Sequence, residues 1–484
     1  MSLLGILLAL ALLIWLTYRG WSTLLLAPGA AMLAAVFAGE PPLAHWTQTF
    51  MYNAAGFVAQ FFPLFLLGAL FGKLMADSGS VSAIATLMTR TLGTRRAMLA
   101  VVLAGALVTY GGVSLFVAFF VIAPMALELF RTADIPRRLA PAAIMLGTST
   151  FTMSALPGTP AIQNAIPMPF FGTTPFAAPG LGAIASAIML GFGLWWLGRA
   201  EAAARAAGEG FGDGADVPVE EVAERELVRE RASVAREFDP AEAPRGQRSN
   251  DSPSPGAALL PLAVVVCVNL LMSLVVLPRW NAGYLAEERW GSTSLAAVGG
   301  VWAVLVALAA AILCLLVLNH RRLPALRETM DAGANAAVLP ALSVASLVGF
   351  GSVVAVLPGF TVVREWVLSI EGGPLVSLAL ATNVLAALTG SASGGLTIAL
   401  QALGGNFMDI ATASGIDPAL LHRVAVIGAG TLDVLPHNGA VVTLLAVCGA
   451  EHRGSYRDIA VVGIIGPVLA LVAVICLGNL FGAF

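Results

Sequence analysis

Residues 374–402, PLVSLALATNVLAALTGSASGGLTIALQA, form an apolar stretch with the run TGSASGG at 389–395 near its middle. A helix of ~20 apolar residues crosses the hydrocarbon layer of a bilayer, and this stretch is longer than that. Glycine inside a helix costs about 1 kcal/mol relative to alanine, so the centre disfavours one continuous helix. The pattern predicts a re-entrant hairpin, whose two helices enter the membrane and return on the same side.

A second stretch, residues 97–130, has a similar centre in the run YGGVS at 110–114. An offset of 279 residues relates the two stretches and other parts of the chain. It pairs Gly111 with Gly390, Ser114 with Ser393, Leu156-Pro157 with Leu435-Pro436, and Phe71-Gly72 with Phe350-Gly351. Single matches between apolar segments are common by chance, but several at one offset predict an internal repeat.

The composition predicts an integral membrane protein. Of the 484 residues, 58% are hydrophobic and 11% are charged, whereas a soluble domain carries roughly 25% charged residues. This excludes a soluble globular enzyme and a disordered chain, and a net charge of −3 without a basic stripe excludes a nucleic-acid binder. The four cysteines lie in apolar blocks without metal-ligand spacing, so we expect no metal site, disulfide framework or cofactor.

Apolar blocks of membrane-spanning length come in two sets of six with a polar connector between them. The first set lies near 3–17, 23–39, 52–76, 97–130, 139–170 and 178–198. The second set lies near 257–278, 295–318, 334–358, 374–402, 421–448 and 459–482. We therefore expect an N-terminal repeat (1–198), a cytoplasmic linker (199–256) and a C-terminal repeat (257–484).

Two of these regions have competing interpretations. The first block lacks a basic start and a cleavage site, so we interpret it as a retained helix rather than a signal peptide. The linker is either a solvated tether between the halves or a regulatory docking segment.

One block in each set is interrupted by proline. The block at 139–170 contains ALPGTPA at 155–161, and the block at 421–448 contains VLPHNGA at 434–440. Proline removes a helical hydrogen bond and clashes with the preceding turn, so both blocks are expected to be broken helices. If the glycine-rich blocks are re-entrant, each half crosses the membrane five times. Because five is odd, the second half must be inverted relative to the first.

The distribution of arginine supports this orientation. With the amino terminus outside, 12 arginines fall in short cytoplasmic loops: Arg19, Arg90, Arg95, Arg96, Arg131, Arg137, Arg138, Arg321, Arg322, Arg327, Arg453 and Arg457. External positions hold Arg279, Arg289 and Arg364, with Arg423 at a helix start. The bias agrees with the positive-inside rule.

The four interruptions are candidates for a substrate site. Lipid cannot hydrogen-bond free main-chain groups, so irregular backbone at membrane depth is kept beside protein or a watery cavity, and transport sites are built this way. Half-helix N-termini suit a carboxylate. The candidate binding residues are Gly111, Gly112, Ser114, Thr148, Ser149, Thr150, Gly158, Thr159, Gln163, Asn164, Gly390, Ser391, Ser393, Gly394, Thr397, Asn438 and Gly439. Alternatively, the small residues serve only close helix packing.

Two ionisable residues near the second break are candidates for ion coupling. Asp433 precedes His437 by four residues, and an Asp–His pair can carry a proton because histidine titrates near neutral pH. Alternatively, both side chains are satisfied by the backbone at the helix break. Lys73, with Asp77 at i+4, is interpreted as a snorkelling pair at the membrane interface.

The sequence resembles the gluconate permease family of proton symporters, part of the ion transporter superfamily. The resemblance runs over most of the chain and is clearest in GALFGKLMADSG at 68–79, the first hairpin, the break after Thr148-Ser149-Thr150 and the hairpin at Gly390-Ser391-Ala392. It implies two inverted repeats, two hairpins and an elevator-type movement against a dimeric scaffold. Gluconate carriers have Pro-Pro-His-Pro-Gly-Pro at the first break, where this chain has LPGTP at 156–160. The second break, with His437, is more similar to the hydroxybutyrate permease branch.

These features predict a proton-coupled importer of a small organic acid anion, such as gluconate or 3-hydroxybutyrate, in the inner membrane of a bacterium. The resemblance implies a homodimer. Three other functions are open: a sodium-coupled di- or tricarboxylate transporter, a passive organic-anion channel, and an intramembrane enzyme using Ser391 or Ser393 beside the His–Asp pair. The glycine spacing does not fit a nucleophile elbow, which disfavours the enzyme.

Overall fold

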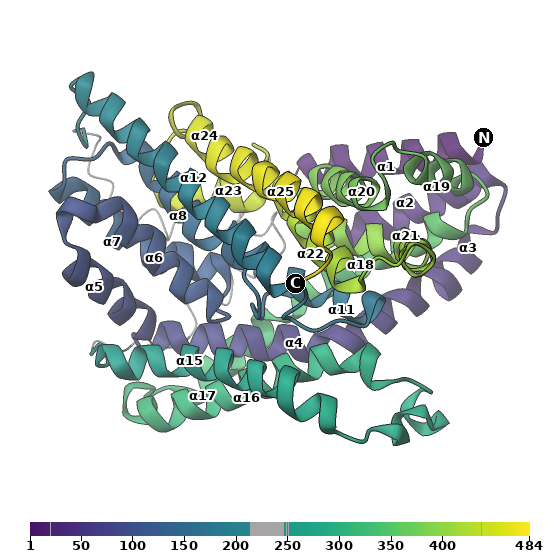
Figure 1. Cartoon of the computed structure of the whole chain (residues 1–484), viewed down its shortest axis with the longest axis horizontal. Coiled ribbons are helices and arrows are strands. Elements are labelled where there is room, and N and C mark those ends of the chain that lie inside the picture. The colour runs from purple at the N-terminus through teal and green to yellow at the C-terminus, as the bar shows by residue number, and fades with distance from the viewer. Residues whose placement is uncertain (20, 213–245, 248, 250, 437) are drawn as a thin grey trace.

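The computed structural model describes residues 1–19, 21–212, 246–247, 249, 251–436 and 438–484. The regular structure in these ranges is helical, with short 3₁₀ and π turns between helices. A helix satisfies its main-chain groups within one segment, which is what an apolar chain in lipid requires. The described part of the chain is therefore an all-helical, multi-spanning protein (Figure 1).

The N-terminal half consists of a helix pair, a long helix, a hairpin, a broken helix and a final long helix. Its helices are α1 (Ser2–Tyr18), α2 (Thr23–Ala38), α3 (Pro42–Ala44), α4 (Met51–Asp77), α5 (Ser80–Leu92), α6 (Ala97–Tyr110), α7 (Leu115–Thr132), α8 (Ala140–Thr148), α9 (Phe151–Ser154), α10 (Ile162–Ala165), α11 (Pro167–Phe171) and α12 (Pro179–Ala206). Short turns lie at η1 (His45–Phe50), η2 (Thr94–Arg96) and η3 (Arg137–Leu139).

The C-terminal half has a similar succession of elements. Its helices are α15 (Pro255–Leu271), α16 (Leu295–Asn319), α17 (Leu326–Ala336), α18 (Val338–Val356), α19 (Phe360–Leu368), α20 (Pro374–Thr389), α21 (Ala392–Ser414), α22 (Pro418–Thr431), α23 (Gly439–Val447), α24 (His452–Ala460) and α25 (Gly466–Phe481). Short turns are η4 (Met272–Val276), η5 (Leu277–Arg279), η6 (Gly283–Ala286), η7 (Glu288–Trp290), η8 (His320–Arg322) and η9 (Val461–Ile465).

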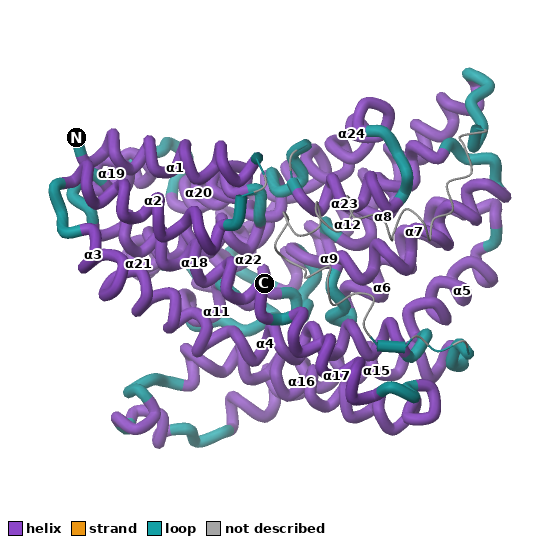
Figure 2. Tube along the Cα trace, turned by 180° about the vertical axis from the view of Figure 1, so that it is seen from behind, coloured by secondary structure: helices purple, strands orange, loops and turns teal. Residues whose placement is uncertain are grey.

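The two glycine-rich runs each form the turn of a helical pair. Residues 111–114 join α6 to α7, and Gly390 with Ser391 joins α20 to α21. The helices of each pair contact one another. Figures 1 and 2, which view the molecule from opposite sides, place α6–α7 toward one end of its long axis and α20–α21 toward the other.

Seven continuous helical runs in the described residues are long and apolar enough to cross a membrane, or eight if α5 and α6 count as one bent span. The bend between α5 and α6 is 102°. Three further apolar helices, α1, α2 and α20, are shorter. The ten crossings expected from the sequence, and the exact domain boundaries, stay predictions.

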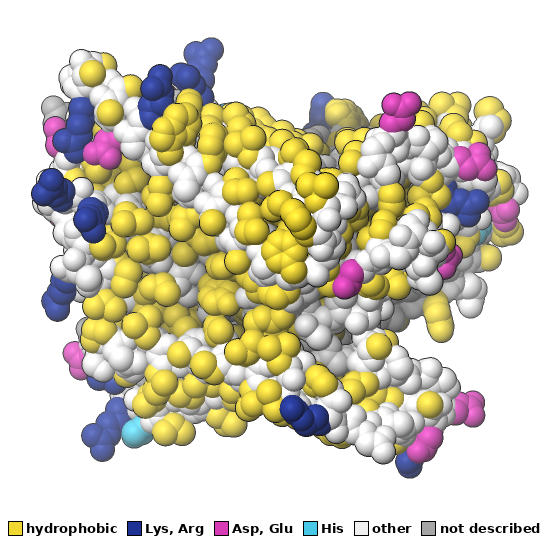
Figure 3. Space-filling model, in the orientation of Figure 1, with side chains coloured by type: hydrophobic (Ala, Val, Ile, Leu, Met, Phe, Trp, Pro, Cys, Tyr) yellow, Lys and Arg dark blue, Asp and Glu magenta, His cyan; other side chains and the backbone are white. Residues whose placement is uncertain are grey.

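The surface separates apolar from charged side chains. Figure 3 shows an apolar band across the face in view, with Lys and Arg side chains gathered along the edge where α5, α7 and the end of α12 lie. The large apolar side chains that the described structure leaves exposed include Trp195, Leu313 and Val317. A contiguous apolar surface of this kind is stable only against lipid or another apolar partner.

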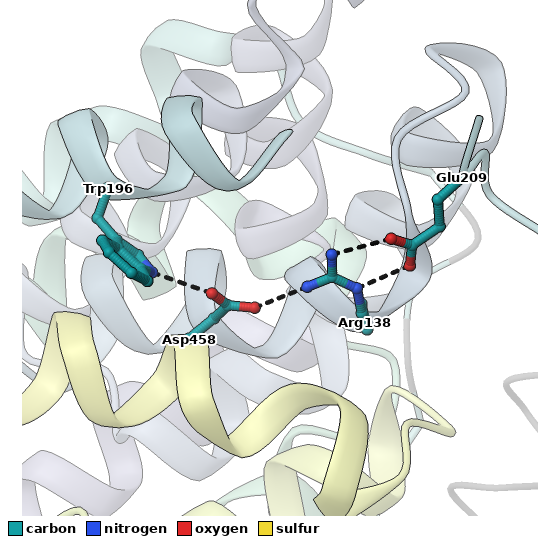
Figure 4. Close-up of polar contacts among 4 residues, drawn as sticks. All are labelled: Arg138, Trp196, Glu209 and Asp458. Atoms are coloured by element: carbon teal, nitrogen blue, oxygen red, sulfur yellow. Dashed lines mark hydrogen bonds and ion pairs between the residues drawn. The ribbon is translucent and has the colours of Figure 1, made fainter. Parts of the chain in front are cut away.

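Both described ends of the polar linker are fixed to the helices. Helix α12 continues through Ala206, past the expected linker start. Beyond it, Glu209 accepts hydrogen bonds from the Arg138 guanidinium at 2.7 and 2.9 Å, and Arg138 also donates to Asp458, which accepts from Trp196 (Figure 4). Hydrogen bonding to Arg138 lowers the pKa of Glu209 below its ordinary value. This end of the linker is thereby joined to η3, α12 and α24.

The other end of the linker lies over Asp77. The Ser249 amide donates to the Asp77 main-chain carbonyl at 2.8 Å. The Asp77 carboxylate is completely buried, accepts from Thr329 on α17 at 2.8 Å, and lies 3.0 Å from the Lys73 ammonium. The expected snorkelling pair is instead a largely buried ion pair within α4, because the linker and α17 cover this helix end.

Candidate functional site

The first break is a series of short helices whose hydroxyl groups bond to the backbone. Thr148 donates to the Ile144 carbonyl at 2.8 Å, Thr150 to the Leu146 carbonyl at 2.7 Å, and Ser154 to the Thr150 carbonyl at 3.0 Å. Ser149 shares a 3.0 Å hydrogen bond with Thr148. These hydroxyls supply donors to main-chain carbonyls where proline and irregular dihedral angles interrupt the helix.

Around Gly158 the break is held from three directions. The Tyr110 hydroxyl, at the end of α6, donates to the Pro157 carbonyl at 2.8 Å, and Asn269 on α15 donates to the Gly158 carbonyl at 2.9 Å. The Gly158 amide donates to the Pro175 carbonyl at 2.9 Å. Gly158 has φ +79°, and a Cβ there would meet the ring of Phe176, so only glycine suits this position.

The remaining predicted residues of the first half lie on or beside this segment. Thr159 is buried and its hydroxyl accepts weakly from the Ala161 amide at 3.4 Å. Gly112, with φ +99°, places the hairpin turn against Pro160 and Leu308, while Gly111 abuts Leu262. Ser114 stands before the first turn of α7 without a side-chain cap bond to it.

The second hairpin turn is stabilised by its own serines. The Ser391 hydroxyl accepts from the Gly394 amide at 3.2 Å and lies 3.1 Å from the Ser393 hydroxyl. Thr397 donates to the Ser393 carbonyl at 2.6 Å. Gly390 has φ +64°, which glycine adopts without strain and which lets the chain reverse between α20 and α21.

Asn438 organises the second break. Its side-chain oxygen accepts from the Ala440 and Val441 amides, so it caps α23 directly before Gly439. Its amide nitrogen donates to the Gly390 carbonyl and to Asp433 Oδ1, each at 2.8 Å. Asp433 lies beyond the end of α22, and the chain from there to Pro436 is not helical. His437 itself lies outside the described residues.

The two irregular centres of each half lie together, and each break also contacts the opposite half. In each half the hairpin turn is hydrogen-bonded to the break of the same half, through Tyr110 and Pro157 in one and Gly390 and Asn438 in the other. Between the halves, α10 contacts α21, α23 contacts α7, and a Cβ at Gly430 would lie 3.1 Å from Ser154 Cβ. Each break therefore lies beside elements of the opposite half.

Sequence reasoning missed a buried polar cluster behind the first break. Arg423, expected at an external helix start, is completely buried and donates to the carbonyls of Ala177 and Ser154. His422 bonds to Thr173 at 2.6 Å and to Asn164 at 3.1 Å. A charged residue inside an otherwise apolar helix was the available signal, and the nearby Pro418 made it resemble a helix start.

A bundle of apolar helices with two hairpins and two interior breaks defines a membrane transporter class, and two solved structures share the fold. The YdaH transporter of Alcanivorax borkumensis, whose crystal structure is described as having an unusual topology, aligns over 91% of this chain and 89% of its own, with a TM-score of 0.56 and 18% identity. MtrF of Neisseria gonorrhoeae, described within a class of antimetabolite efflux pumps, aligns over 89% and 83%, with a TM-score of 0.53 and 13% identity. At these identities the similarity shows the fold alone.

Sequence relatives establish the family. The model of the GntP family permeases matches residues 1–168. A Bacillus subtilis (strain 168) protein, the uncharacterized transporter YxjC, is 39% identical over 491 residues and covers the whole of both chains. The chain belongs to the GntP permease family, a family of membrane transporters, as the resemblance to gluconate permeases predicted. Family membership thus indicates a transporter rather than an enzyme.

Proposed function

We propose that the protein is a secondary active transporter of the bacterial inner membrane that couples uptake of a small organic acid anion to a cation. The observation that carries the proposal is the pairing of hairpin turn and broken helix in each half, Tyr110 with Pro157 and Asn438 with Gly390. Each pairing brings irregular backbone from two places in the chain together, and each break lies beside elements of the opposite half, which supports a transport site between the halves.

Buried hydroxyl and amide groups suit a hydroxy-monocarboxylate such as 3-hydroxybutyrate or gluconate. Thr148, Ser149, Thr159, Ser393 and Asn438 are each at most 5% exposed. Their hydroxyls and amides can exchange a backbone or neighbour bond for one to the ligand. We propose that they bind the substrate together with the other glycines, hydroxyls and amides predicted from the sequence.

Coupling is proposed to use Asp433, with His437 as its predicted partner. The Asp433 side chain is 9% exposed and bonded to Asn438, which also holds the second hairpin turn. Protonating or neutralising this carboxylate would change its bond to Asn438 and thereby the hairpin. A proton is favoured over sodium because carboxylate and imidazole both accept protons.

The two halves are proposed to be inverted repeats that move in an elevator-type manner within a homodimer. Two observations support inversion: the hairpins lie toward opposite ends of the long axis, and cationic side chains gather at one of these ends (Figures 1 and 3). By the positive-inside rule, that end, which carries α5 and α7, faces the cytoplasm.

The test is uptake into liposomes containing the purified protein, with labelled 3-hydroxybutyrate, gluconate and citrate under imposed proton or sodium gradients. We expect accumulation of a hydroxy-monocarboxylate above equilibrium when the proton gradient is present. Accumulation of citrate under a sodium gradient would identify a sodium-coupled di- or tricarboxylate transporter instead. Flux that never exceeds equilibrium would identify a passive channel, and no movement of any of these acids would refute the proposal.

A further inference from the structure

The buried Arg423 carries a positive charge that no acidic side chain in the described part of the chain neutralises. Its Nε and Nη2 donate to the Ala177 carbonyl at 3.2 and 2.7 Å, and its Nη1 donates to the Ser154 carbonyl at 3.2 Å. Main-chain carbonyls solvate the guanidinium but leave its net charge. Burying a charge without an opposite partner is costly. Because the charge of Arg423 is not neutralised, its electric field acts on a ligand that binds nearby.

The hydrogen bonds around Asn164 identify Arg423 as the source of that charge. Asn164 Nδ2 donates to the Thr159 and Pro175 carbonyls at 3.0 and 3.1 Å, so its Oδ1 must face α22 as an acceptor. His422 Nε2 lies 3.1 Å from this oxygen and therefore carries a proton, and the Thr173 hydroxyl lies 2.6 Å from Nδ1, where it satisfies the other nitrogen. A neutral His422 fits these contacts without a second ring proton. Arg423, at 3.4 Å from the same oxygen, is the cation of the cluster.

The second break carries the opposite charge. The 279-residue offset pairs Asp433 with Ser154, so the position that is acidic in the second half is a neutral serine in the first. It also pairs Arg423 with Ile144. Arg423 extends from α22 to the carbonyl of Ser154, the counterpart of Asp433. One break is thus positive and the other negative, although the two halves are alike in their order of elements.

Gln163 places a polar amide group in the first break, the one that Arg423 makes positive. Gln163 as a whole is 4% exposed, and its amide makes no hydrogen bond to another side chain or carbonyl in the described part of the chain. It belongs to α10, which contacts α21 of the second hairpin, so it lies where the first break meets the opposite half. An amide that is not engaged by the protein has N–H groups available to donate to a ligand.

We propose that the site is electrically polarised, with the substrate carboxylate bound at the first break and the coupling cation at the second. Gln163 donates to the carboxylate. Arg423 is a positioning residue that acts through Ser154 and Asn164 and supplies the attracting field. Asp433 attracts the cation. This inference rests on the proposed function and assigns the two ligands of that transporter to its two breaks.

The experiment compares uptake of labelled 3-hydroxybutyrate with that of its uncharged counterpart, 3-hydroxybutyramide, by the full-length protein in liposomes. For Arg423→Gln we expect the apparent KM of the acid to rise by roughly tenfold or more, with little change for the amide. Arg423→Lys keeps the charge and should retain the preference for the acid.

Asp433→Asn should lose gradient-driven accumulation but keep exchange of labelled for unlabelled acid. Arg137→Gln is the matched control, because Arg137 also donates to a main-chain carbonyl, that of Cys448, away from both breaks.

A rise in KM that is equal for the acid and the amide would show a structural role for Arg423 and overturn the inference. If Arg423→Gln fails to fold, Gln163→Leu decides instead, since it must also raise the KM of the acid more than that of the amide. Wild-type protein that neither moves nor binds 3-hydroxybutyrate, gluconate or citrate would refute the proposed function and this inference with it. Normal uptake by the wild type with an unchanged acid preference in the Arg423 and Gln163 variants would refute the inference alone.

Discussion

Asn438 uses both ends of its amide, and its surroundings explain why asparagine stands there. The oxygen caps α23 through the amides of Ala440 and Val441, and the nitrogen donates to Gly390 and Asp433. Aspartate would keep the cap but could not donate, and serine is too short to make all four contacts. The residue thus joins the second hairpin to the second break.

We expect Asn438→Ala to lose both gradient-driven uptake and stability. Removing an N-cap costs about 1 kcal/mol, and losing the bond to Gly390 frees the hairpin turn. The control is Asp417→Ala, which removes the cap of α22, where Asp417 accepts from the Ala419 amide at 2.7 Å. Thermal unfolding and liposome uptake should show a similar stability loss in both variants but lost uptake only in Asn438→Ala. Equal uptake by the two variants would contradict the binding role of Asn438.

The sequence located the chain reversals and helix interruptions, because there the chemistry is local. Pro157, Gly158 and Gly390 stand at them because proline and glycine have strong conformational preferences wherever they occur, and Asn438 was singled out for its amide beside the second break. Arg423 was misplaced because its partners, Ser154 and Ala177, lie some 250 residues earlier in the chain. Sequence alone contains no signal that brings those carbonyls to it.

At the scale of elements, glycines set how closely the hairpin helices approach. A Cβ at Gly395 on α21 would collide with the main chain of Ala386 on α20. A Cβ at Gly147 on α8 would likewise collide with the Val102 carbonyl on α6. Small residues allow such contacts between membrane helices, so part of the glycine pattern serves packing. The glycines of the hairpin therefore allow close helix packing, in addition to the substrate-binding role proposed above.

We expect Gly395→Ala to destabilise the second hairpin, because a methyl group there has no room. Overpacking of this kind costs about 1–3 kcal/mol. Gly405→Ala on the same helix is the matched control, since a Cβ at Gly405 meets nothing within 4 Å. Alanine should stabilise that exposed position by up to about 1 kcal/mol. Thermal unfolding in detergent compares the two, and an equal effect at both positions would contradict the close approach of α20 and α21.

At the scale of the whole molecule, orientation is tested by labelling from each side of the membrane. Arg95 and Glu371 are exposed residues at the connections before α6 and α20. In a variant whose four cysteines are replaced by alanine, Glu371→Cys should react with an impermeant maleimide in intact cells. Arg95→Cys should react only in inverted vesicles. Labelling of both positions from the same side would contradict the inverted arrangement.

The Arg138–Glu209 contact makes a small, pH-dependent contribution to stability. The pKa of the Glu209 carboxyl is lower in the folded than in the unfolded protein. Glu209 therefore stabilises the fold above its unfolded pKa of about 4.3. This contribution is lost as the pH falls through the lowered folded pKa. The Glu209 side chain is 41% exposed, so the pair is worth about 1 kcal/mol at most after solvent screening.

We therefore expect Glu209→Gln to unfold at a lower temperature than the wild type at neutral pH, with the difference vanishing near pH ~3. Thermal unfolding across this pH range measures it. Glu128→Gln serves as control, because Glu128 is an exposed side chain that lies 3.9 Å from Arg131 on its own helix, α7. A difference that grows as pH falls would contradict the assigned ion pair.

The sequence by itself determined the class of protein, the two hairpins, the two breaks and the family. The class, the hairpins and the breaks follow from local composition: apolar length, glycine at reversals and proline at interruptions. The family follows from the resemblance of longer motifs such as GALFGKLMADSG at 68–79. Only the tertiary structure decided that Arg423 lies behind the first break, that Asn269 holds Gly158, and that Asp77 is buried against Thr329. These contacts join residues far apart in the chain, and their energies depend on how helices pack rather than on the preferences of any one segment.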